Sequence, residues 1–156
     1  MFRVGIIGPE STGKSSLAKY LAKRYNGVLI PEYAREYVEQ KGTTEVSYEE
    51  LCAIAKHQIE ELEAVSSLQS SISFFDTELI VTKVWFDYAF GQVPEWLNEA
   101  IRRYPMDVYL LTYPDLPWTQ DGARYNGSEE KRQELFARYE AEILALNIPY
   151  YIIKHS

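Results

Sequence analysis

Eight residues near the start of the chain, GPESTGKS, match the phosphate-binding pattern G-x-x-x-x-G-K-[ST] at every fixed position. Glycines in this pattern let the backbone turn its amides toward phosphate oxygens, and the following helix adds its partial positive charge. The lysine reaches the β and γ phosphates, and the last serine offers a hydroxyl to Mg²⁺. An apolar run precedes the loop and a helical pattern follows it, so a chance glycine-rich turn is the weaker interpretation. The residues assigned to the nucleotide are Gly8, Glu10, Ser11, Thr12, Gly13, Lys14, Ser15 and Ser16.

A second candidate is Asp76, which comes directly after the apolar run ISFF. A carboxylate at this place can hold Mg²⁺, usually through water, and can contact an incoming hydroxyl group. The alternative is that Asp76 caps the following helix, because aspartate is a favoured N-cap residue. We favour the functional interpretation, because a phosphate loop needs an acidic partner for its metal. Ser15 and Asp76 are therefore the predicted Mg²⁺ ligands.

The stretch PEYAREY follows the second apolar run and contains Glu32 and Arg35. Glu32 is placed to point into a cleft next to the γ-phosphate, where transfer to an alcohol needs a group that accepts or orients the hydroxyl proton. Arg35 follows one helical turn later and can bind a polar substrate. An ordinary surface ion pair, Glu32 with Arg35 or Arg35 with Glu39, accounts for the same residues equally well.

The loop from 113 to 127 is rich in Pro, Gly and Asp and is long for a connection without regular structure. Loops of this kind are often lids, and we place a lid at about residues 113–128. A cation on a closing lid can stabilise the charge on a transferred phosphoryl group. Arg124 is the first candidate for this cation, and Lys131 and Arg132 are weaker ones. The alternative is a surface loop with incidental charges.

Strand patterns alternate with helical patterns along the chain. Strands are expected at residues 2–7, 28–30, 72–75, 108–111 and 150–153. Helices are expected at 14–25, within 31–42, after Ser47, at 79–90, from Pro94, and at 129–146 after a cap at Ser128. Such alternation predicts an α/β protein with a parallel sheet covered on both faces. Ligands on such sheets bind at the carboxyl ends of the strands, so Asp76 and the phosphate loop should face one cleft.

A long helix is predicted after Ser47. Ser47 and Glu50 form a capping box, which predicts its first turn. His57 on this helix has no metal-binding partner at suitable spacing, so we expect an ordinary exposed or hydrogen-bonded histidine. Cys52 is expected in the core. One helical face carries the apolar residues Leu51, Ile54, Ala55, Ile59 and Leu62.

The bulk composition bounds the kind of protein. A chain of 156 residues is one domain by the usual size prior, and we treat residues 1–156 as a single domain. Its net charge of -7 gives little attraction for nucleic acid or for an anionic membrane surface. A single cysteine excludes an internal disulfide framework and fits a reducing cytosol. No apolar run approaches the roughly 20 residues of a membrane span, so we expect a cytoplasmic protein without a nucleic-acid or membrane partner.

Several motifs taken together resemble a known family. GPESTGKS, EYAREY, KHQ, FFDTELIVTKVWFDYAFG and DVYLLTYPDLPWTQDGAR occur in order between Gly8 and Arg124. This set is similar to the ribosylnicotinamide kinase domain of the NadR type, in the nucleoside-kinase branch of the phosphate-loop fold. The resemblance implies a three-layer αβα phosphate-loop NTPase fold with a five-stranded parallel sheet. It also implies ATP-dependent phosphorylation of the 5′-hydroxyl of nicotinamide riboside, which gives nicotinamide mononucleotide.

The resemblance also implies a role for individual residues. Lys14, Ser15 and Arg124 would serve ATP and Mg²⁺, and Glu32 and Asp76 would hold and activate the ribose hydroxyl. Lys14, Glu32, Asp76 and Arg124 are thus the implied catalytic set. The implied nucleoside-binding residues are Glu32, Tyr33, Arg35, Asp76, Thr77, Tyr88 and Asp121.

The chain departs from the family in three places. Pro31 replaces an aromatic residue that we associate with the position before Glu32-Tyr33. If that ring stacks on the nicotinamide, this protein must stack it with another ring or prefer another nucleoside. Tyr33, Tyr37, Trp85 and Tyr88 are the candidates for this other ring. The first kinase strand begins at residue 2, so we expect no preceding adenylyltransferase or DNA-binding domain. The chain stops after the last strand, so we expect the C-terminal helix of related kinases to be missing.

Two alternative functions remain beside a nicotinamide riboside kinase. The departure at Pro31 motivates a kinase for another nucleoside or small alcohol. A different class is an ATP-binding module that senses nucleotide and signals to a partner without transferring phosphate. The paired acids Glu32 and Asp76 favour catalysis, because a sensor has less need of a base beside the γ-phosphate.

Overall fold

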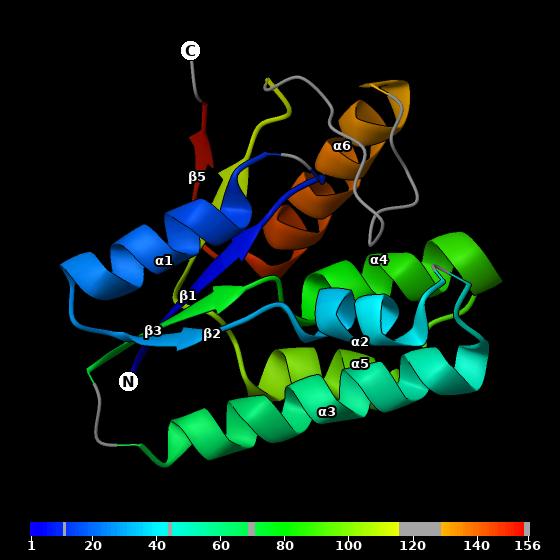
Figure 1. Ribbon diagram of the computed structural model, residues 1–156, viewed down its shortest axis with the longest axis horizontal. Coiled ribbons are helices and arrows are strands. Elements are labelled where there is room, and N and C mark those ends of the chain that lie inside the picture. The colour runs from blue at the N-terminus through cyan, green and yellow to red at the C-terminus, as the bar shows by residue number, and fades with distance from the viewer. Residues whose placement is uncertain (11, 44, 69–70, 116–128, 155–156) are drawn as a thin grey trace.

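A single parallel sheet forms the centre of the molecule. The computed structural model describes residues 1–10, 12–43, 45–68, 71–115 and 129–154. Five strands pair in the order β2-β3-β1-β4-β5, and all neighbours run parallel (Figure 1). Their bounds are β1 (Phe2–Ile7), β2 (Val28–Ile30), β3 (Ile72–Asp76), β4 (Val108–Thr112) and β5 (Tyr150–Ile153). The predicted strands and the α/β fold class are confirmed.

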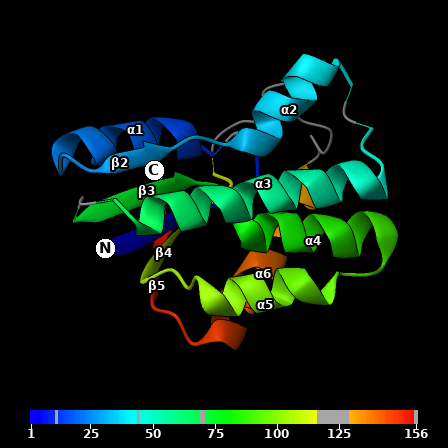
Figure 2. The same cartoon turned by 90° about the horizontal axis from the view of Figure 1, so that it is seen from below.

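Helices cover both faces of this sheet. Their bounds are α1 (Lys14–Arg24), α2 (Tyr33–Lys41), α3 (Tyr48–Ser66), α4 (Leu79–Phe90), α5 (Glu95–Arg103) and α6 (Glu129–Leu146). On one face, Ala18 and Ala22 of α1 pack against Ile6 and Phe74. On the other face, α3, α4, α5 and α6 enclose the larger apolar core (Figures 1 and 2). The result is the three-layer arrangement of phosphate-loop NTPases.

The local sequence explains where the helices begin and end. The capping box of α3 is present, because Ser47 Oγ accepts from the Glu50 amide at 3.1 Å and Glu50 Oε1 accepts from the Ser47 amide at 3.0 Å. Asn26 follows α1 in the left-handed conformation, with φ of 53°. Pro94 is the N-cap of α5, one residue before its first turn. Ser128, the expected cap of α6, lies outside the described residues.

The strand register brings the site residues together. Ile6 of β1 pairs with Asp76 of β3, and Ile7 pairs with Leu111 of β4. The carboxyl ends of these three strands therefore meet at one edge of the sheet, where the phosphate loop also begins.

Among the described helices, none is long and apolar enough to cross a bilayer.

Candidate active site

The phosphate loop is held tightly against the end of β4. A Cβ atom at Gly8 would lie 2.0 Å from Thr112 Oγ1 and 2.8 Å from the Thr112 carbonyl oxygen, so only glycine fits there. The Thr12 hydroxyl lies 2.6 Å from that of Thr112 and 2.7 Å from the Pro9 carbonyl oxygen. Gly13 closes the loop as the N-cap of α1, with φ of 82°. These contacts fix the loop backbone at the N-terminus of a helix, where an anion is stabilised.

Lys14 lies inside this loop rather than in solvent. Its side chain is 4% exposed, and Nζ donates to the Pro9 carbonyl oxygen at 3.2 Å. The ammonium group is thereby held against the backbone of the loop at Pro9. Ser16 is exposed on α1, and Ser11 lies outside the described residues.

Ser15 and Asp76 meet directly. Ser15 Oγ donates to Asp76 Oδ2 at 2.6 Å, and Asp76 is 5% exposed. The interpretation of Asp76 as a helix cap is wrong, because Glu78 is the N-cap of α4 and its Oε1 accepts from the Ile80 amide at 3.1 Å. The hydroxyl of Ser15 and the carboxylate of Asp76 are both hard oxygen donors, the type that Mg²⁺ prefers.

Glu78 belongs to the core beneath the site rather than to the cavity. Its Oε1 also accepts from the Tyr109 hydroxyl at 3.0 Å. Burial raises the pKa of Glu78 to about 7, against smaller opposing effects of its hydrogen bonds to Ile80 and Tyr109. Burial, together with this carboxyl group, raises the pKa of Tyr109 well above its ordinary value. The pair anchors the start of α4 to β4.

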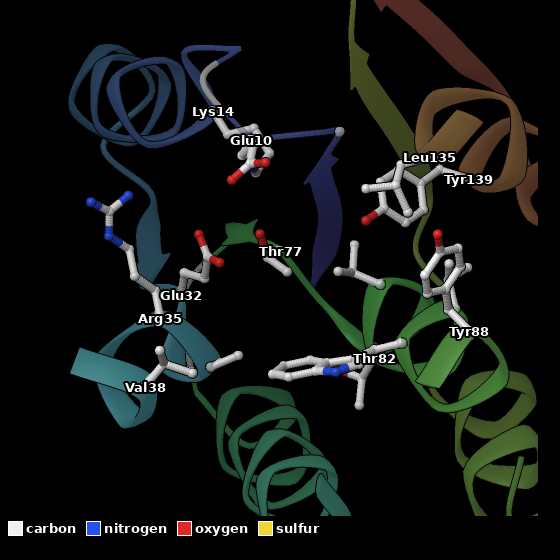
Figure 3. A pocket seen from close by; sticks show the side chains of 15 residues that line it. Glu10, Lys14, Glu32, Arg35, Val38, Thr77, Thr82, Tyr88, Leu135 and Tyr139 are labelled. Atoms are coloured by element: carbon white, nitrogen blue, oxygen red, sulfur yellow. The ribbon is translucent and has the colours of Figure 1, made fainter. Parts of the chain in front are cut away.

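A cavity opens beside the phosphate loop (Figure 3). It contains about 800 Å³ of free space, counting the solvent at its open mouth. Small-molecule sites usually combine apolar walls with a few polar groups, as this lining does. The lining residues are Gly8, Glu10, Lys14, Glu32, Ala34, Arg35, Val38, Thr77, Val81, Thr82, Val84, Trp85, Tyr88, Leu135 and Tyr139. The loop, α2, α4 and α6 thus enclose one compartment.

Glu32 and Arg35 both line this cavity from α2, but they differ in orientation. Glu32 is the N-cap residue of α2, and its side chain makes no capping hydrogen bond. Figure 3 shows its carboxylate directed toward the middle of the cavity, with Glu10 approaching from the phosphate loop. Arg35 Nε is paired with Glu39 Oε1 at 3.0 Å, so the predicted surface ion pair exists for Arg35 and Glu39.

The structure does not bring Tyr33 into the cavity lining. Its ring instead stacks on the imidazole of His57, with ring centroids 3.6 Å apart. Tyr37 also turns toward α3, where its hydroxyl donates to Glu50 at 2.8 Å. Both residues lie on the face of α2 that packs against α3, which the predicted helix alone did not reveal. Of the four aromatic candidates, Trp85 and Tyr88 line the cavity.

Several lining residues escaped the sequence analysis. Leu135 and Tyr139 lie four positions apart on α6, and that spacing is equally typical of core packing. Thr82 is buried, and its hydroxyl donates to Gln58 Oε1 at 2.6 Å. Gln58 is part of the KHQ motif, so the sequence did contain a signal for the partner of Thr82.

The basic residues of α6 take different positions. Lys131 Nζ lies 3.7 Å from the centroid of the Tyr88 ring. Arg132 is fully buried and pairs with Glu129 at 3.0 Å. The preferred lid cation Arg124, together with Trp118 and Asp121, lies outside the described residues.

Comparison with known proteins identifies the type of domain. A family model described as an AAA domain matches residues 3–156. The trifunctional NAD biosynthesis/regulator protein NadR of Escherichia coli K12 is 30% identical over 147 residues, which cover 92% of this chain. The chain spans only 36% of the length of that protein.

Solved structures agree with this similarity. NadR in complex with NR superposes with a TM-score of 0.79 at 26% identity, covering 97% of this chain and 43% of that one. A second NadR structure, in complex with NAD and AMP-PNP, also has a TM-score of 0.79, at 25% identity, covering 99% and 44%. Thymidylate kinase from Ehrlichia chaffeensis has a TM-score of 0.69 at 16% identity, covering 99% and 87%, which shows the fold alone. The chain has a phosphate-loop NTPase fold, and most of this chain's length is similar to part of NadR.

Proposed function

We propose that this chain is an ATP-dependent kinase that phosphorylates the 5′-hydroxyl of nicotinamide riboside to give nicotinamide mononucleotide. The chain belongs to the AAA domain family, whose model matches residues 3–156. One observation carries the proposal: Glu32 extends from α2 into the cavity that the phosphate loop and Lys14 also line. A nucleotide-binding loop and a carboxylate that share a cavity are the two halves that transfer to an alcohol needs.

On the donor side, the loop amides and Lys14 would bind the triphosphate of ATP. The direct contact of Ser15 with Asp76 offers two oxygen donors for Mg²⁺. The chemistry that Mg²⁺ supplies when bound is neutralisation of charge on the phosphate oxygens. Remaining ligands would come from phosphate and water.

On the acceptor side, Glu32 would receive the proton of the attacking hydroxyl. Arg35, Trp85 and Tyr88 would surround the nucleoside, and Tyr88 or Trp85 would supply the stacking ring that Pro31 does not. We place the lid at about 113–128, with Arg124 on the transferred phosphoryl group and Asp121 near the acceptor. NadR structures with NR and with AMP-PNP support this choice of donor and acceptor.

A coupled ADP-release assay with a panel of nucleosides and small alcohols tests the proposal. The expected result is Mg²⁺-dependent turnover of nicotinamide riboside and formation of its 5′-phosphate. Turnover of another acceptor but not this one would contradict the substrate and favour the alternative that Pro31 motivates. ATP binding without transfer to any acceptor would instead indicate a nucleotide sensor.

Lys14→Ala tests the donor half of the mechanism. Removal of the ammonium group should lower the transfer rate on the order of a hundredfold or more, because it leaves the phosphate charge without its cation. An unchanged rate would overturn the assignment of the phosphate loop as the donor site. Lys19→Ala, an exposed lysine one turn further along α1, is the matched control.

A further inference from the structure

Thr77 lines the cavity and has an unusual backbone conformation. It follows Asp76 at the end of β3 and has φ of 71°, in the left-handed region. Its amide donates to the Ile6 carbonyl oxygen at 2.9 Å, which fixes the backbone at this point. A β-branched residue is a genuine outlier in this region, because its branched Cβ is crowded there. Glycine or asparagine would satisfy the same turn with less strain.

The hydroxyl of Thr77 is a second energetically unfavourable feature of this residue. The residue is 6% exposed, and Oγ1 has no hydrogen-bond partner among the described residues. Burying a hydroxyl without a partner is unfavourable, so such groups are rare in native proteins. Strain and an unsatisfied polar group in one residue are typical of a functional site, where a ligand supplies the missing partner.

The position of Thr77 indicates what that ligand is. Thr77 lines the cavity, and Figure 3 shows it directed into the same central space as Glu32. The residue before it, Asp76, is bonded to Ser15 of the phosphate loop. Thr77 therefore follows the residue that is bonded to the phosphate loop, and it shares the central space of the cavity with Glu32. A group bound there would be the one that reacts.

We propose that the Thr77 hydroxyl donates a hydrogen bond to the attacking oxygen of the acceptor alcohol. This inference rests on the proposed kinase function and assigns a further catalytic residue to it. An alcohol oxygen has one hydrogen and two lone pairs. With its hydrogen bonded to Glu32 and one lone pair bonded to Thr77, the other lone pair is directed at the γ-phosphorus. Thr77 thus orients the nucleophile in addition to binding it.

The chemical step balances with these groups. A bond forms between the acceptor oxygen and the γ-phosphorus, and the bond from the γ-phosphorus to the β,γ-bridging oxygen breaks. The hydroxyl proton passes to Glu32, and ADP carries away the bonding electron pair. The Thr77 hydroxyl keeps its own proton throughout, so it acts by orientation and by hydrogen bonding alone.

Thr77→Val is the central test, because valine keeps the shape and the β-branch but removes the hydroxyl. Turnover should fall on the order of a hundredfold, with the KM for ATP unchanged. The melting temperature should stay equal or rise, because an unsatisfied buried hydroxyl is lost. Thr77→Ser should restore most of the turnover. Thr43→Val, which removes an exposed hydroxyl near the end of α2, is the matched control.

Thr77→Gly separates catalysis from folding. Relief of the left-handed strain should raise the melting temperature, while turnover should fall as in the valine variant. A purely structural Thr77 would instead lose stability in both variants and keep its rate per folded molecule, which would overturn the inference. Normal turnover of Thr77→Val, with an active wild-type enzyme, would overturn it too. A wild-type protein that phosphorylates no acceptor would remove the proposed function and this role together.

Discussion

Two carboxylates and two cations, Lys14 and Arg35, line the cavity next to a loop that would bind a polyanion. Glu10 and Glu32 both line it, and Asp76 lies just beyond at the Ser15 hydroxyl. Carboxylates near a triphosphate are unfavourable unless a cation or a proton transfer uses them. In the proposed kinase, Mg²⁺ would use Asp76 and the acceptor proton would use Glu32.

Glu32→Gln tests the base at the residue scale. The amide keeps the size of the side chain but cannot accept the proton, so turnover should fall by roughly 10²–10⁴-fold. ATP affinity should be unchanged or slightly higher, because one negative charge is removed from the cavity. Steady-state kinetics with varied ATP and varied acceptor separate these effects. Glu36→Gln removes a charge from the same helix outside the cavity lining and should remain fully active.

At the scale of elements, α2 and α3 form one structural unit through Glu50. Glu50 caps α3, accepts from the Tyr37 hydroxyl at 2.8 Å, and pairs with Lys41 at 2.6 Å. The Lys41 ammonium group, followed by the Ser47 amide and Tyr37, lowers the pKa of Glu50 to about 2. Because α2 also carries Glu32 and Arg35, this unit helps to position one wall of the cavity.

Protonation of Glu50 in acid should weaken the contacts that hold α2 against α3. The folded-state pKa of Glu50 is depressed from 4.5, so its contribution to stability is present above pH 4.5 and is lost as the pH falls toward 2. Urea unfolding between pH 6 and pH 3 should therefore show a steeper loss of stability for the wild type than for Glu50→Gln. Equal pH dependence of the two proteins would contradict the assignment.

The cap itself can be tested separately. Ser47→Ala removes the acceptor of the Glu50 amide and should lower the free energy of unfolding by about 1 kcal/mol at neutral pH. Chemical denaturation measures this change. Ser67→Ala removes a serine that follows the other end of α3 and should have a smaller effect, because it takes no part in the capping box.

At the scale of the whole molecule, the site joins elements from distant parts of the chain. The phosphate loop, α2, α4 and α6 all contribute side chains to the cavity. Since α4 packs against α3, α5 and α6, the wall of the cavity that α4 forms is continuous with the large core. Ligands that bridge these elements should stabilise the entire fold rather than one segment.

ATP with Mg²⁺ should raise the melting temperature in a concentration-dependent manner. Binding to the folded state alone adds about 2.7 kcal/mol of stability when the ligand is at 100 times its Kd. Thermal unfolding with and without EDTA measures both the nucleotide effect and its metal dependence. Lys14→Ala should abolish most of the shift, and a shift of wild-type size in that variant would contradict the loop assignment.

The fold was largely predictable because its signals are local. Apolar runs, the phosphate-loop pattern and the Ser47–Glu50 box each act within a few residues. The candidate site was predictable where it follows a strand end, as at Asp76, because parallel strands end at one edge. The lining residues on α6 were not, since the spacing of Leu135 and Tyr139 is shared by core and cavity positions.

The sequence by itself determined a phosphate-loop α/β protein with Lys14, Ser15 and Asp76 at one sheet edge. Only the tertiary structure decided that Tyr33 stacks on His57, that Glu78 rather than Asp76 caps α4, and that Arg35 pairs with Glu39. It also placed Thr77 in a left-handed conformation with a buried hydroxyl. The physical reason is that a side chain's direction depends on helix packing and on backbone dihedrals, which distant residues impose.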